Sequence, residues 1–256
     1  MNGDAELAGQ LATRAGELLL QLRADSGFGA PDVLRKAGDR NSNELLVAAL
    51  REARPDDAIL SEESADDLTR LSADRVWIVD PLDGTAEFGD EGRTDWAVHV
   101  ALWERGAGGL TAGAVALPGL GRTLTTGGDL PAPKEPATPL RFAVSRTRRP
   151  PWFDGMAERA GGVAVPIGSA GMKAMSVVLG DVDAYVHSGR MKEWDSAAPA
   201  AVAAAAGLHV SRLDGSPVEF NTPERLTLDL LICLPTIADR LLAAVSGIAG
   251  TDTAER

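Results

Sequence analysis

Carboxylates stand at four places in this 256-residue chain where predicted elements end, and two of these places carry a pair of them. Asp80 and Asp83 follow an apolar run directly, in the segment Asp-Pro-Leu-Asp-Gly-Thr. Pro81 fixes one backbone angle and Gly84 permits a tight turn, so both carboxylates can converge with the Leu82 carbonyl. Hard oxygen ligands of this kind suit Mg²⁺ or Mn²⁺. The segment therefore predicts a divalent-metal site.

The other carboxylates are Asp39, the adjacent pair Glu62 and Glu63, and Asp195 at the start of an alanine-rich helix. If a helix begins at Gly84 or Thr85, its free N–H groups face the predicted metal site and would hold a phosphate. The alternative is an Asp-rich turn in which one Asp caps a helix. Such a turn requires one Asp, and not a buried strand followed by two.

One competing motif has the form Asp-x-Asp-Gly-Thr after an apolar strand. It is the nucleophile loop of haloacid-dehalogenase-type phosphatases, in which the nucleophile lies two residues before the second Asp. That position is Pro81 in this chain, and proline cannot attack a phosphate. We therefore expect water activated by metal ions to attack, without an aspartyl-phosphate.

Composition narrows the class of protein. Hydrophobic residues make up 45% of the chain and charged residues 24%, which is ordinary for a globular protein and excludes a disordered one. The formal net charge of −12 disfavours non-specific nucleic-acid binding, and Cys233 alone excludes an internal disulfide. We expect no signal peptide, no membrane association and a soluble cytoplasmic protein.

Hydrophobic periodicity predicts the elements that position these residues. A first amphipathic helix is predicted over residues 7–22, and a second after residue 43, where Asn41 and Glu44 resemble a capping pair. Further helices are predicted at residues 170–179, 196–206 and 236–248, and strands at residues 58–61, 76–79, 96–103, 111–117, 140–144, 163–167, 182–187 and 230–234.

A loop rich in glycine and proline, residues 118–139, is the most linker-like stretch of the chain. We place a domain boundary within it. Residues 1–135 are predicted to form an N-terminal α+β domain that carries most of the metal ligands. Residues 136–256 are predicted to form a C-terminal α/β domain that completes the metal and substrate site.

Three separated motifs resemble those of the inositol monophosphatase superfamily in order and spacing. They are Ser-Glu-Glu-Ser at residues 61–64, Asp-Pro-Leu-Asp-Gly-Thr at 80–85 and Trp-Asp-Ser-Ala-Ala at 194–198. The resemblance covers nearly the whole chain. It implies a layered αβαβα sandwich, of α+β or α/β class, and a Mg²⁺-dependent, lithium-sensitive phosphatase.

The resemblance also implies roles by position. The implied metal ligands are Glu62, Asp80, the Leu82 carbonyl, Asp83 and Asp195, which would hold two or three Mg²⁺ ions that Mn²⁺ can replace. Asp39 and Thr85 are implied to orient or deprotonate the attacking water, with Glu62 as a further catalytic residue. Two ions about 3.5–4 Å apart can stabilise both the attacking and the leaving oxygen. Because the carboxylates repel one another, we expect Asp83→Asn to preserve or raise the stability of the metal-free chain.

Local features of the chain resemble one branch of this superfamily, the 3′(2′),5′-bisphosphate nucleotidases, and most of all their actinobacterial CysQ group. Glu87 stands where inositol monophosphatases usually carry Asn, and residues 144–148 and 168–173 are similar to nucleotidase segments. The first of these segments departs from the nucleotidase pattern at Thr147 and Arg148, and Ala86 replaces a Lys or Arg that is common in the group. The resemblance implies hydrolysis of 3′-phosphoadenosine 5′-phosphate to AMP and phosphate, in sulfur assimilation and nucleotide recycling.

The substrate contacts implied by this resemblance fall into three groups. The metal-bound 3′-phosphate is expected at Asp80, Asp83 and the amides of Gly84 and Thr85, and the 5′-phosphate at Ser145, Arg146 and Lys173. The remaining nucleotide atoms are expected at Gly168, Ser169 and Glu193, and Asp195 is a further expected substrate contact. The simpler interpretation of Ser169 and Lys173 is a helix-capping serine beside a surface lysine.

Other functions remain open at this stage. An inositol-1-monophosphatase or a fructose-1,6-bisphosphatase would use the same metal site, and a catalytically silent nucleotide-binding protein is a further alternative. The resemblance implies a homodimer with a small phosphorylated nucleotide as its partner.

Overall fold

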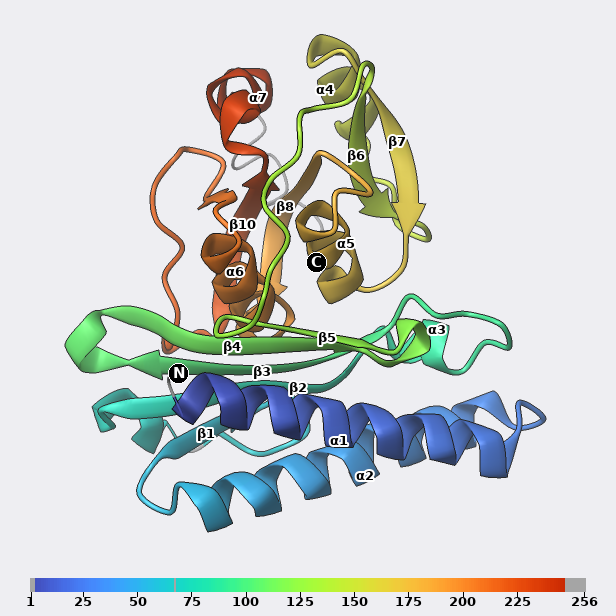
Figure 1. Cartoon of the computed structure of the whole chain (residues 1–256), viewed down its shortest axis with the longest axis vertical. Helices are drawn as coiled ribbons and strands as arrows, with labels where there is room; N and C mark the ends of the chain where they lie inside the picture. The colour runs from blue at the N-terminus through green and yellow to red at the C-terminus, as the bar shows by residue number, and fades with distance from the viewer. Residues whose placement is uncertain (1–2, 67, 247–256) are drawn as a thin grey trace.

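The computed structural model describes residues 3–66 and 68–246 of the chain. Helices and sheets alternate in layers: α1 and α2 cover one face of a first sheet, α5 and α6 lie between the two sheets, and α4 and α7 lie at the far end (Figure 1). This arrangement confirms the predicted layered sandwich. The helices are α1 Gly3–Ser26, α2 Pro31–Ala53, α3 Thr85–Phe88, α4 Phe153–Arg159, α5 Ala170–Val178, α6 Glu193–Ala205 and α7 Ala238–Val245.

The first sheet has the strand order β1-β2-β3-β4-β5. Strand β1 is parallel to β2, and each following pair is antiparallel. Helix α1 packs on β3, β4 and β5, and α2 packs on β2. The strands are β1 Ala58–Ser61, β2 Arg75–Asp83, β3 Ala97–Glu104, β4 Gly109–Leu117 and β5 Arg122–Thr125, and short 3-10 turns cover η1 Thr69–Ser72, η2 Arg105–Ala107 and η3 Pro118–Leu120.

The second sheet has the order β7-β6-β8-β10-β9. Strand β6 is parallel to both of its neighbours, whereas β10 is antiparallel to β8 and to β9. The strands are β6 Leu140–Ser145, β7 Gly162–Ile167, β8 Ala184–Lys192, β9 His209–Ser211 and β10 Leu226–Cys233, and η4 Pro235–Ile237 precedes α7.

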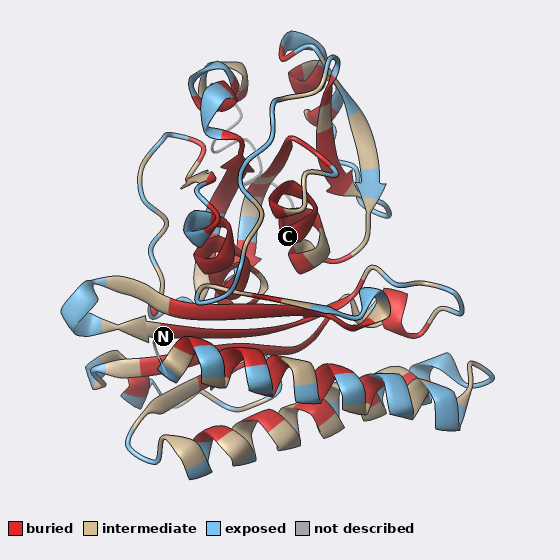
Figure 2. Ribbon diagram, in the orientation of Figure 1, coloured by how far each residue is buried: buried red, intermediate tan, exposed pale blue. Residues whose placement is uncertain are grey.

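Buried residues form two clusters. One lies between the α1–α2 layer and the first sheet, and includes Leu19, Leu46 and Trp77. The other joins the opposite face of the first sheet to the second sheet through α5 and α6. Figure 2 shows red, buried ribbon on both sheets and on these two helices. Because both sheets contribute to this second cluster, the two halves share a core. The predicted division at residue 135 falls between β5 and β6 and stays a prediction.

The second helix begins earlier than predicted. It starts at Pro31, in the first turn where proline costs little, so Asp39 and Asn41 lie inside the helix rather than at a cap. The polar residues there instead make tertiary contacts: the Ser42 hydroxyl donates to the Pro81 carbonyl at 2.7 Å. Gly38 permits the close packing, since a Cβ there would lie 2.7 Å from the Phe88 ring.

Some short elements were missed by the sequence analysis. β5, β9 and α4 have few residues, and β5 lies inside the loop predicted over residues 118–139. β8 also extends five residues beyond the predicted strand, through Lys192, so α6 begins at Glu193. The predicted last helix divides into η4 and α7, and its final residues 247–248 lie outside the described residues.

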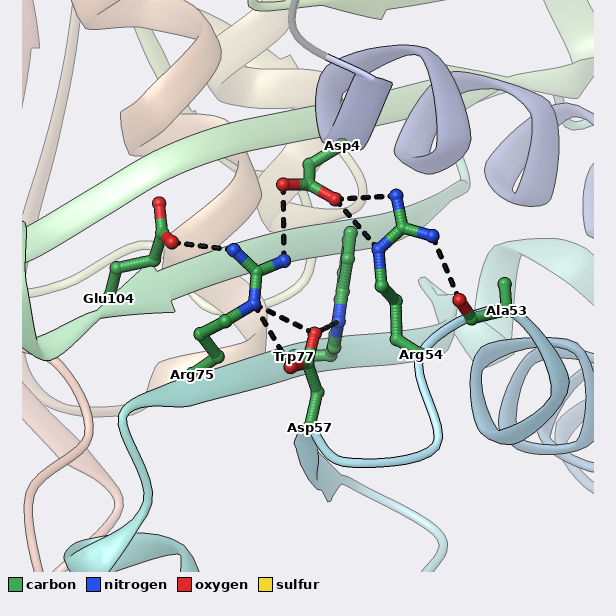
Figure 3. A network of polar contacts seen from close by, with 7 residues as sticks. All are labelled: Asp4, Ala53, Arg54, Asp57, Arg75, Trp77 and Glu104. Carbon is green, nitrogen blue, oxygen red and sulfur yellow. Dashed lines mark hydrogen bonds and ion pairs between the residues drawn. The ribbon is translucent and has the colours of Figure 1, made fainter.

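A polar network surrounds the first residue of β2 (Figure 3). The Arg75 guanidinium contacts Asp57 at 2.9 Å, Asp4 at 3.1 Å and Glu104 at 2.5 Å. The Trp77 indole N–H donates to Asp57 at 2.8 Å. These contacts tie α1, the β1 approach and β3 to β2, and so fix the strand whose other end carries Asp80 and Asp83.

Candidate active site

Strand β2 ends in a bulge that turns two carboxylates toward the same point. Its pairing with β3 shifts register between Asp80 and Asp83. Residues three apart in a regular strand face opposite sides of the sheet. Pro81 has no N–H for the ladder, and the resulting irregularity removes that constraint. The Asp80 carboxylate also accepts from the Leu82 N–H at 3.0 Å, which closes the turn.

Asp195 joins these two residues from the first turn of α6. Carboxylate oxygens of Asp80, Asp83 and Asp195 all lie within 4.8 Å of one another, and the first two residues are buried. Three hard oxygen donors this close are a suitable donor set for a divalent cation. The residues present therefore fit a metal centre.

The negative charges of the carboxylate cluster repel one another, and a bound cation would offset this repulsion. Burial and repulsion by Glu62, Asp83 and Asp195 raise the pKa of Asp80 well above its ordinary value. Burial, followed by repulsion from Asp83 and Glu62, raises the pKa of Asp195 to about 7. Without a cation, both side chains resist ionisation near neutral pH.

Asp83 differs from its neighbours because the protein itself neutralises it. The N–H groups of Ala170 and Gly171, at the start of α5, donate to its two oxygens at 3.1 and 2.5 Å. Burial alone would raise the pKa of Asp83, but His99 and these amides outweigh burial and lower the pKa. These contacts of the charged form of Asp83 argue against the expected preservation of metal-free stability in Asp83→Asn, which stays a prediction.

His99 lies fully buried behind Asp83. Its Nε2 is 3.2 Å from an Asp83 oxygen, and its Nδ1 is 2.9 Å from the Trp194 carbonyl. A carbonyl only accepts, so Nδ1 carries a proton. Burial works to lower the pKa of His99, but Asp83 and the Trp194 carbonyl outweigh it and raise the pKa. A Cβ at Gly171 would overlap the His99 ring, so this close packing requires glycine.

Asp39 and Thr85 lie together beside the carboxylates, as a pair. The Thr85 hydroxyl is 3.3 Å from an Asp39 oxygen and 3.1 Å from the Leu82 carbonyl. Burial and the negative charge of Glu63 raise the pKa of Asp39 to about 6. A carboxylate with such a pKa can accept a proton near neutral pH.

Glu62 follows β1 directly, and its N–H donates to the Val79 carbonyl of β2 at 3.4 Å. Burial, together with the charges of Glu63 and Asp39, raises the pKa of Glu62. Its carboxylate also contacts Asp80. The structure thus brings Glu62 to the edge of the carboxylate cluster.

The predicted substrate residues Gly168 and Ser169 meet the first half of the chain through Asp95. The Gly168 N–H donates to the Asp95 carboxylate at 2.7 Å, and the Ser169 N–H donates to the Asp95 carbonyl at 3.1 Å. The Ser169 hydroxyl caps α5 by accepting from the Met172 N–H at 3.0 Å. In this structure, these amides serve protein acceptors.

Lys173 is buried, contrary to the surface interpretation. Its ammonium donates to the Gly168 carbonyl at 2.7 Å and lies 5.4 Å from the Tyr185 ring centroid. Burial lowers the pKa of Lys173, although Asp83 and Glu87 oppose the shift. Its predicted contact with the 5′-phosphate stays a prediction.

Ser145 is the last residue of β6, and Arg146 follows it directly. The Arg146 guanidinium pairs with the buried Glu87 at 2.9 Å and keeps a third of its side chain exposed. The Ser145 hydroxyl accepts from the Arg148 N–H at 3.1 Å. Arg146 therefore joins the second sheet to α3 and remains accessible to an anion.

Glu193, predicted beside the base and ribose, is fully buried. Its oxygens accept from the backbone N–H groups of Asn221 and Thr222, each at 2.8 Å. Gly84, at the start of α3, has the left-handed φ of 88° that a tight turn requires.

The sequence analysis did not select His99 and Asp95. His99 pairs with Asp80 in the β2–β3 register, so the strand pairing, once known, would have found it. Asp95 precedes β3 in a loop, and nothing in its sequence neighbourhood indicates its partners Gly168 and Ser169 in the turn before α5. No described helix is both long and apolar enough to cross a membrane.

Comparison with known proteins places this geometry in a family. The chain is 51% identical to a 3′-phosphoadenosine 5′-phosphate phosphatase of Mycobacterium leprae, over 94% of this chain and 93% of that protein. It is 33% identical to an inositol-1-monophosphatase of Mycobacterium bovis, over 97% of this chain and 92% of the relative.

A solved structure of CysQ from Bacteroides thetaiotaomicron superposes with a TM-score of 0.75 at 25% identity, covering 91% of this chain and 98% of that one. The family model for the inositol monophosphatase family matches residues 5–249. The match extends across both sheets and all the residues of the carboxylate cluster. The chain belongs to the inositol monophosphatase family.

Proposed function

We propose that this chain is a Mg²⁺-dependent phosphatase that hydrolyses the 3′-phosphate of 3′-phosphoadenosine 5′-phosphate (PAP), giving AMP and phosphate. The observation that carries the proposal is that carboxylate oxygens of Asp80, Asp83 and Asp195 lie within 4.8 Å of one another, a donor set that fits divalent cations. The choice of PAP is supported by 51% identity to a mycobacterial PAP phosphatase, against 33% to an inositol-1-monophosphatase.

Divalent cations, when bound, would offset the negative charge of the carboxylates, polarise a phosphoryl group and make water more acidic. Asp80, Asp83, Asp195, Glu62 and the Leu82 carbonyl are the proposed ligands. Two or three Mg²⁺ ions, or Mn²⁺ in their place, are part of the proposal.

The chain supplies the proton path. The Thr85 hydroxyl has one proton and two acceptors within reach, the Asp39 carboxylate and the Leu82 carbonyl. When Thr85 donates to Asp39, its oxygen lone pairs can accept a proton from an attacking water. As Thr85 gains the proton of the water, it passes its own proton to Asp39, whose pKa, raised to about 6, lets it accept a proton near neutral pH.

Pro81 supports attack by water rather than by the protein. Pro81 stands where haloacid-dehalogenase-type phosphatases carry their aspartyl nucleophile. Its carbonyl accepts a hydrogen bond from the buried Ser42 hydroxyl. No covalent phosphoenzyme is therefore expected during turnover. Trapping phosphate on the protein in a hydroxylamine-sensitive form would contradict this step.

The second phosphate of PAP needs positive charge outside the carboxylate cluster, because a chain of net charge −12 repels anions. Arg146 is the proposed partner, since its guanidinium is accessible and its present acceptor, Glu87, can be exchanged for a phosphate. Ser145 and Lys173 are proposed to act beside it.

The test of the function compares phosphate release from PAP, 3′-AMP, inositol 1-phosphate and fructose 1,6-bisphosphate as kcat/KM. PAP is expected to exceed 3′-AMP, which lacks the 5′-phosphate, by more than about tenfold, because a charge-assisted contact contributes about 1.5–3 kcal/mol. A higher value for inositol 1-phosphate than for PAP would replace the nucleotidase proposal with the monophosphatase alternative.

The variant Arg146→Ala sharpens this comparison. It should reduce the preference for PAP over 3′-AMP while leaving 3′-AMP hydrolysis nearly unchanged. Arg149→Ala is the matched control, because Arg149 pairs only with the exposed Asp154 among the ion pairs described. Equal slowing of both substrates by Arg146→Ala would show that Arg146 acts on the fold or the metal centre instead.

A homodimer, which the family resemblance implies, and a cytoplasmic location complete the proposal. Light scattering coupled to gel filtration tests the first, and fractionation of the producing cells tests the second.

A further inference from the structure

A second buried polar network lies outside the carboxylate cluster, centred on Arg70 in η1. Only 2% of the Arg70 surface is exposed. Its guanidinium donates to the Asn221 side-chain oxygen at 2.6 Å and to the Thr222 carbonyl at 2.8 Å. It also forms an ion pair with Asp66 at 2.9 Å. Arg70 therefore fastens the segment between β1 and β2 to the segment before β10.

Glu193 continues the network to the start of α6. One of its oxygens accepts from the Asn221 N–H at 2.8 Å, and the other accepts from the Thr222 N–H at 2.8 Å and the Thr222 hydroxyl at 2.6 Å. The Glu193 N–H donates to the Arg225 carbonyl at 3.1 Å. Asp66, Arg70, Glu193, Asn221 and Thr222 are called the tether below.

The tether connects two segments that each carry a carboxylate of the active site. Glu62 precedes Asp66 and Arg70 on the segment that joins β1 to β2, and Asp195 follows Glu193 within the first turn of α6. Because one helical turn moves as a unit, a shift of Glu193 displaces Asp195. The side chains of all three charged members, Asp66, Arg70 and Glu193, are buried. A buried ion pair is by itself weak evidence for a gain in stability.

The backbone around the tether is strained in a way that supports a positioning role. Among the described residues, the non-glycine residues with left-handed φ are Leu68, Asn221 and Arg225, with φ of 64°, 60° and 57°. All three lie in the two segments that Arg70 joins. Such conformations are costly for ordinary residues and persist where surrounding contacts impose them.

We propose that the tether is a positioning device that sets the separation of Glu62 and Asp195 and thereby the affinity of the carboxylate cluster for divalent cations. None of its members touches the substrate or the cations in this proposal. Contacts behind metal ligands contribute in this way because they fix the orientation of the ligand before the ion arrives. The inference rests on the proposed metal-dependent function.

The test measures cation binding rather than turnover. Mn²⁺ is titrated into the metal-free, full-length protein by calorimetry, for the wild type, Glu193→Gln and Arg70→Met. Both variants are expected to bind Mn²⁺ about 10–100-fold more weakly. Excess Mg²⁺ should restore kcat, because the ligands themselves are intact. Unfolding by urea is measured in parallel.

Arg141→Met is the matched control. Arg141 pairs with the buried Asp183 at 3.0 Å, at the end of β6 opposite Arg146. It should lose stability while its Mn²⁺ affinity stays within twofold of wild type. If Glu193→Gln and Arg70→Met lose only stability, as this control does, the tether is structural and the inference fails.

Thr222→Val is a milder variant for the case in which the buried substitutions prevent folding. It removes the hydrogen bond from the Thr222 hydroxyl to Glu193. The hydrogen bonds of the Thr222 N–H to Glu193 and of Arg70 to the Thr222 carbonyl stay in place, and Thr222 is only half-buried. A several-fold loss of Mn²⁺ affinity is expected, and unchanged affinity would overturn the inference. Wild-type protein that binds Mn²⁺ but does not hydrolyse PAP would contradict the proposed function alone.

Discussion

The two ends of strand β2 hold clusters of carboxylates that the protein treats in opposite ways. At the first end, Arg75 and Arg54 contact Asp4, and Arg75 also contacts Asp57 and Glu104 (Figure 3). At the last end, no arginine or lysine pairs with Asp80 or Asp195 among the described ion pairs.

The pKa values follow this difference. Burial works to raise the pKa of Asp4, but hydrogen bonds from Arg54 and Arg75 outweigh it and lower the pKa. Burial and like charges raise the pKa of Asp80 and Asp195 instead. Arginines therefore neutralise the carboxylates at the first end of β2, whereas at the last end, of the three clustered carboxylates, Asp83 alone has a lowered pKa, because His99 and the α5 amides outweigh burial. We call these the structural end and the chemical end of the strand.

The largest expected effect comes from comparing Asp83→Asn with Asp57→Asn. Asp83→Asn should lower kcat/KM for PAP by more than roughly 100-fold, because loss of a residue behind a ligand already costs 10–100-fold. Asp57→Asn should leave kcat/KM per folded molecule unchanged and lower the free energy of unfolding by about 1–3 kcal/mol. Steady-state kinetics and urea unfolding measure both. Equal losses of kcat/KM in Asp83→Asn and Asp57→Asn would contradict the assignment of catalysis to one end of β2 and stability to the other.

Thr85→Ala tests the proton path at the chemical end. It should lower kcat by roughly 10²–10⁴-fold with little change in substrate affinity, because it removes the hydroxyl between water and Asp39. Thr85→Ser keeps the hydroxyl and should retain most of the activity. A Thr85→Ala enzyme that changes KM and not kcat would show that Thr85 binds substrate without moving a proton.

Arg75→Met tests the structural end. It leaves Asp57 and Asp4 without their shared guanidinium, so the free energy of unfolding should fall by roughly 3 kcal/mol. Arg149→Met, which breaks an exposed pair, should change it by less than about 1 kcal/mol. Urea unfolding provides the measurement. Similar values for the two variants would mean that the network in Figure 3 contributes little.

The smallest expected effect is a pH dependence of the metal-free protein. The pKa of Asp195 is raised to about 7 in the fold, and an unfolded Asp has a pKa of about 3.9. Between these values the folded state holds the extra proton, so stability falls as pH rises from about 4 to about 7. Thermal unfolding in EDTA should show this slope, at roughly 2–4 °C per kcal/mol for a chain of this size.

Two additions complete the pH experiment. Asp195→Asn should flatten the slope, and Mg²⁺ at pH 7.5 should raise the unfolding temperature of the wild type. A metal-free protein whose stability rises over the same pH window would contradict the raised pKa of Asp195. Asp4, whose pKa is lowered, acts in the opposite sense and loses its contribution only below about pH 4.

Much of the fold could be predicted from the sequence, because the hydrophobic residues of long strands and amphipathic helices recur with a period that the sequence shows directly. The run before Asp80 became β2, and the alanine-rich stretch after Asp195 became α6. The start of α2 was not predicted, since the residues around Asn41 resemble a helix cap and the sequence does not show their contacts with distant residues. Short edge strands such as β5 lack the length to show a period.

The candidate site divides in the same way. The carboxylates were found because their spacing at element ends is local, and the structure brings Asp80, Asp83 and Asp195 together. The buried contacts of His99 and Lys173 depend on how strands pair and how helices pack on them. These tertiary contacts cannot be predicted from the pattern of one sequence. The different electrostatic condition of Asp83 likewise depends on the first turn of α5.

The contribution of α6 to the carboxylate cluster also bears on how the protein is made. Glu62, Asp80 and Asp83 leave the ribosome early, whereas Asp195 and the strand that braces its helix, β10, belong to the last third of the chain. A nascent or truncated chain therefore exposes an incomplete acidic site, and phosphate-ester hydrolysis begins only after the distal segment has folded back. The onset of activity therefore depends on the synthesis and folding of the segment that carries α6.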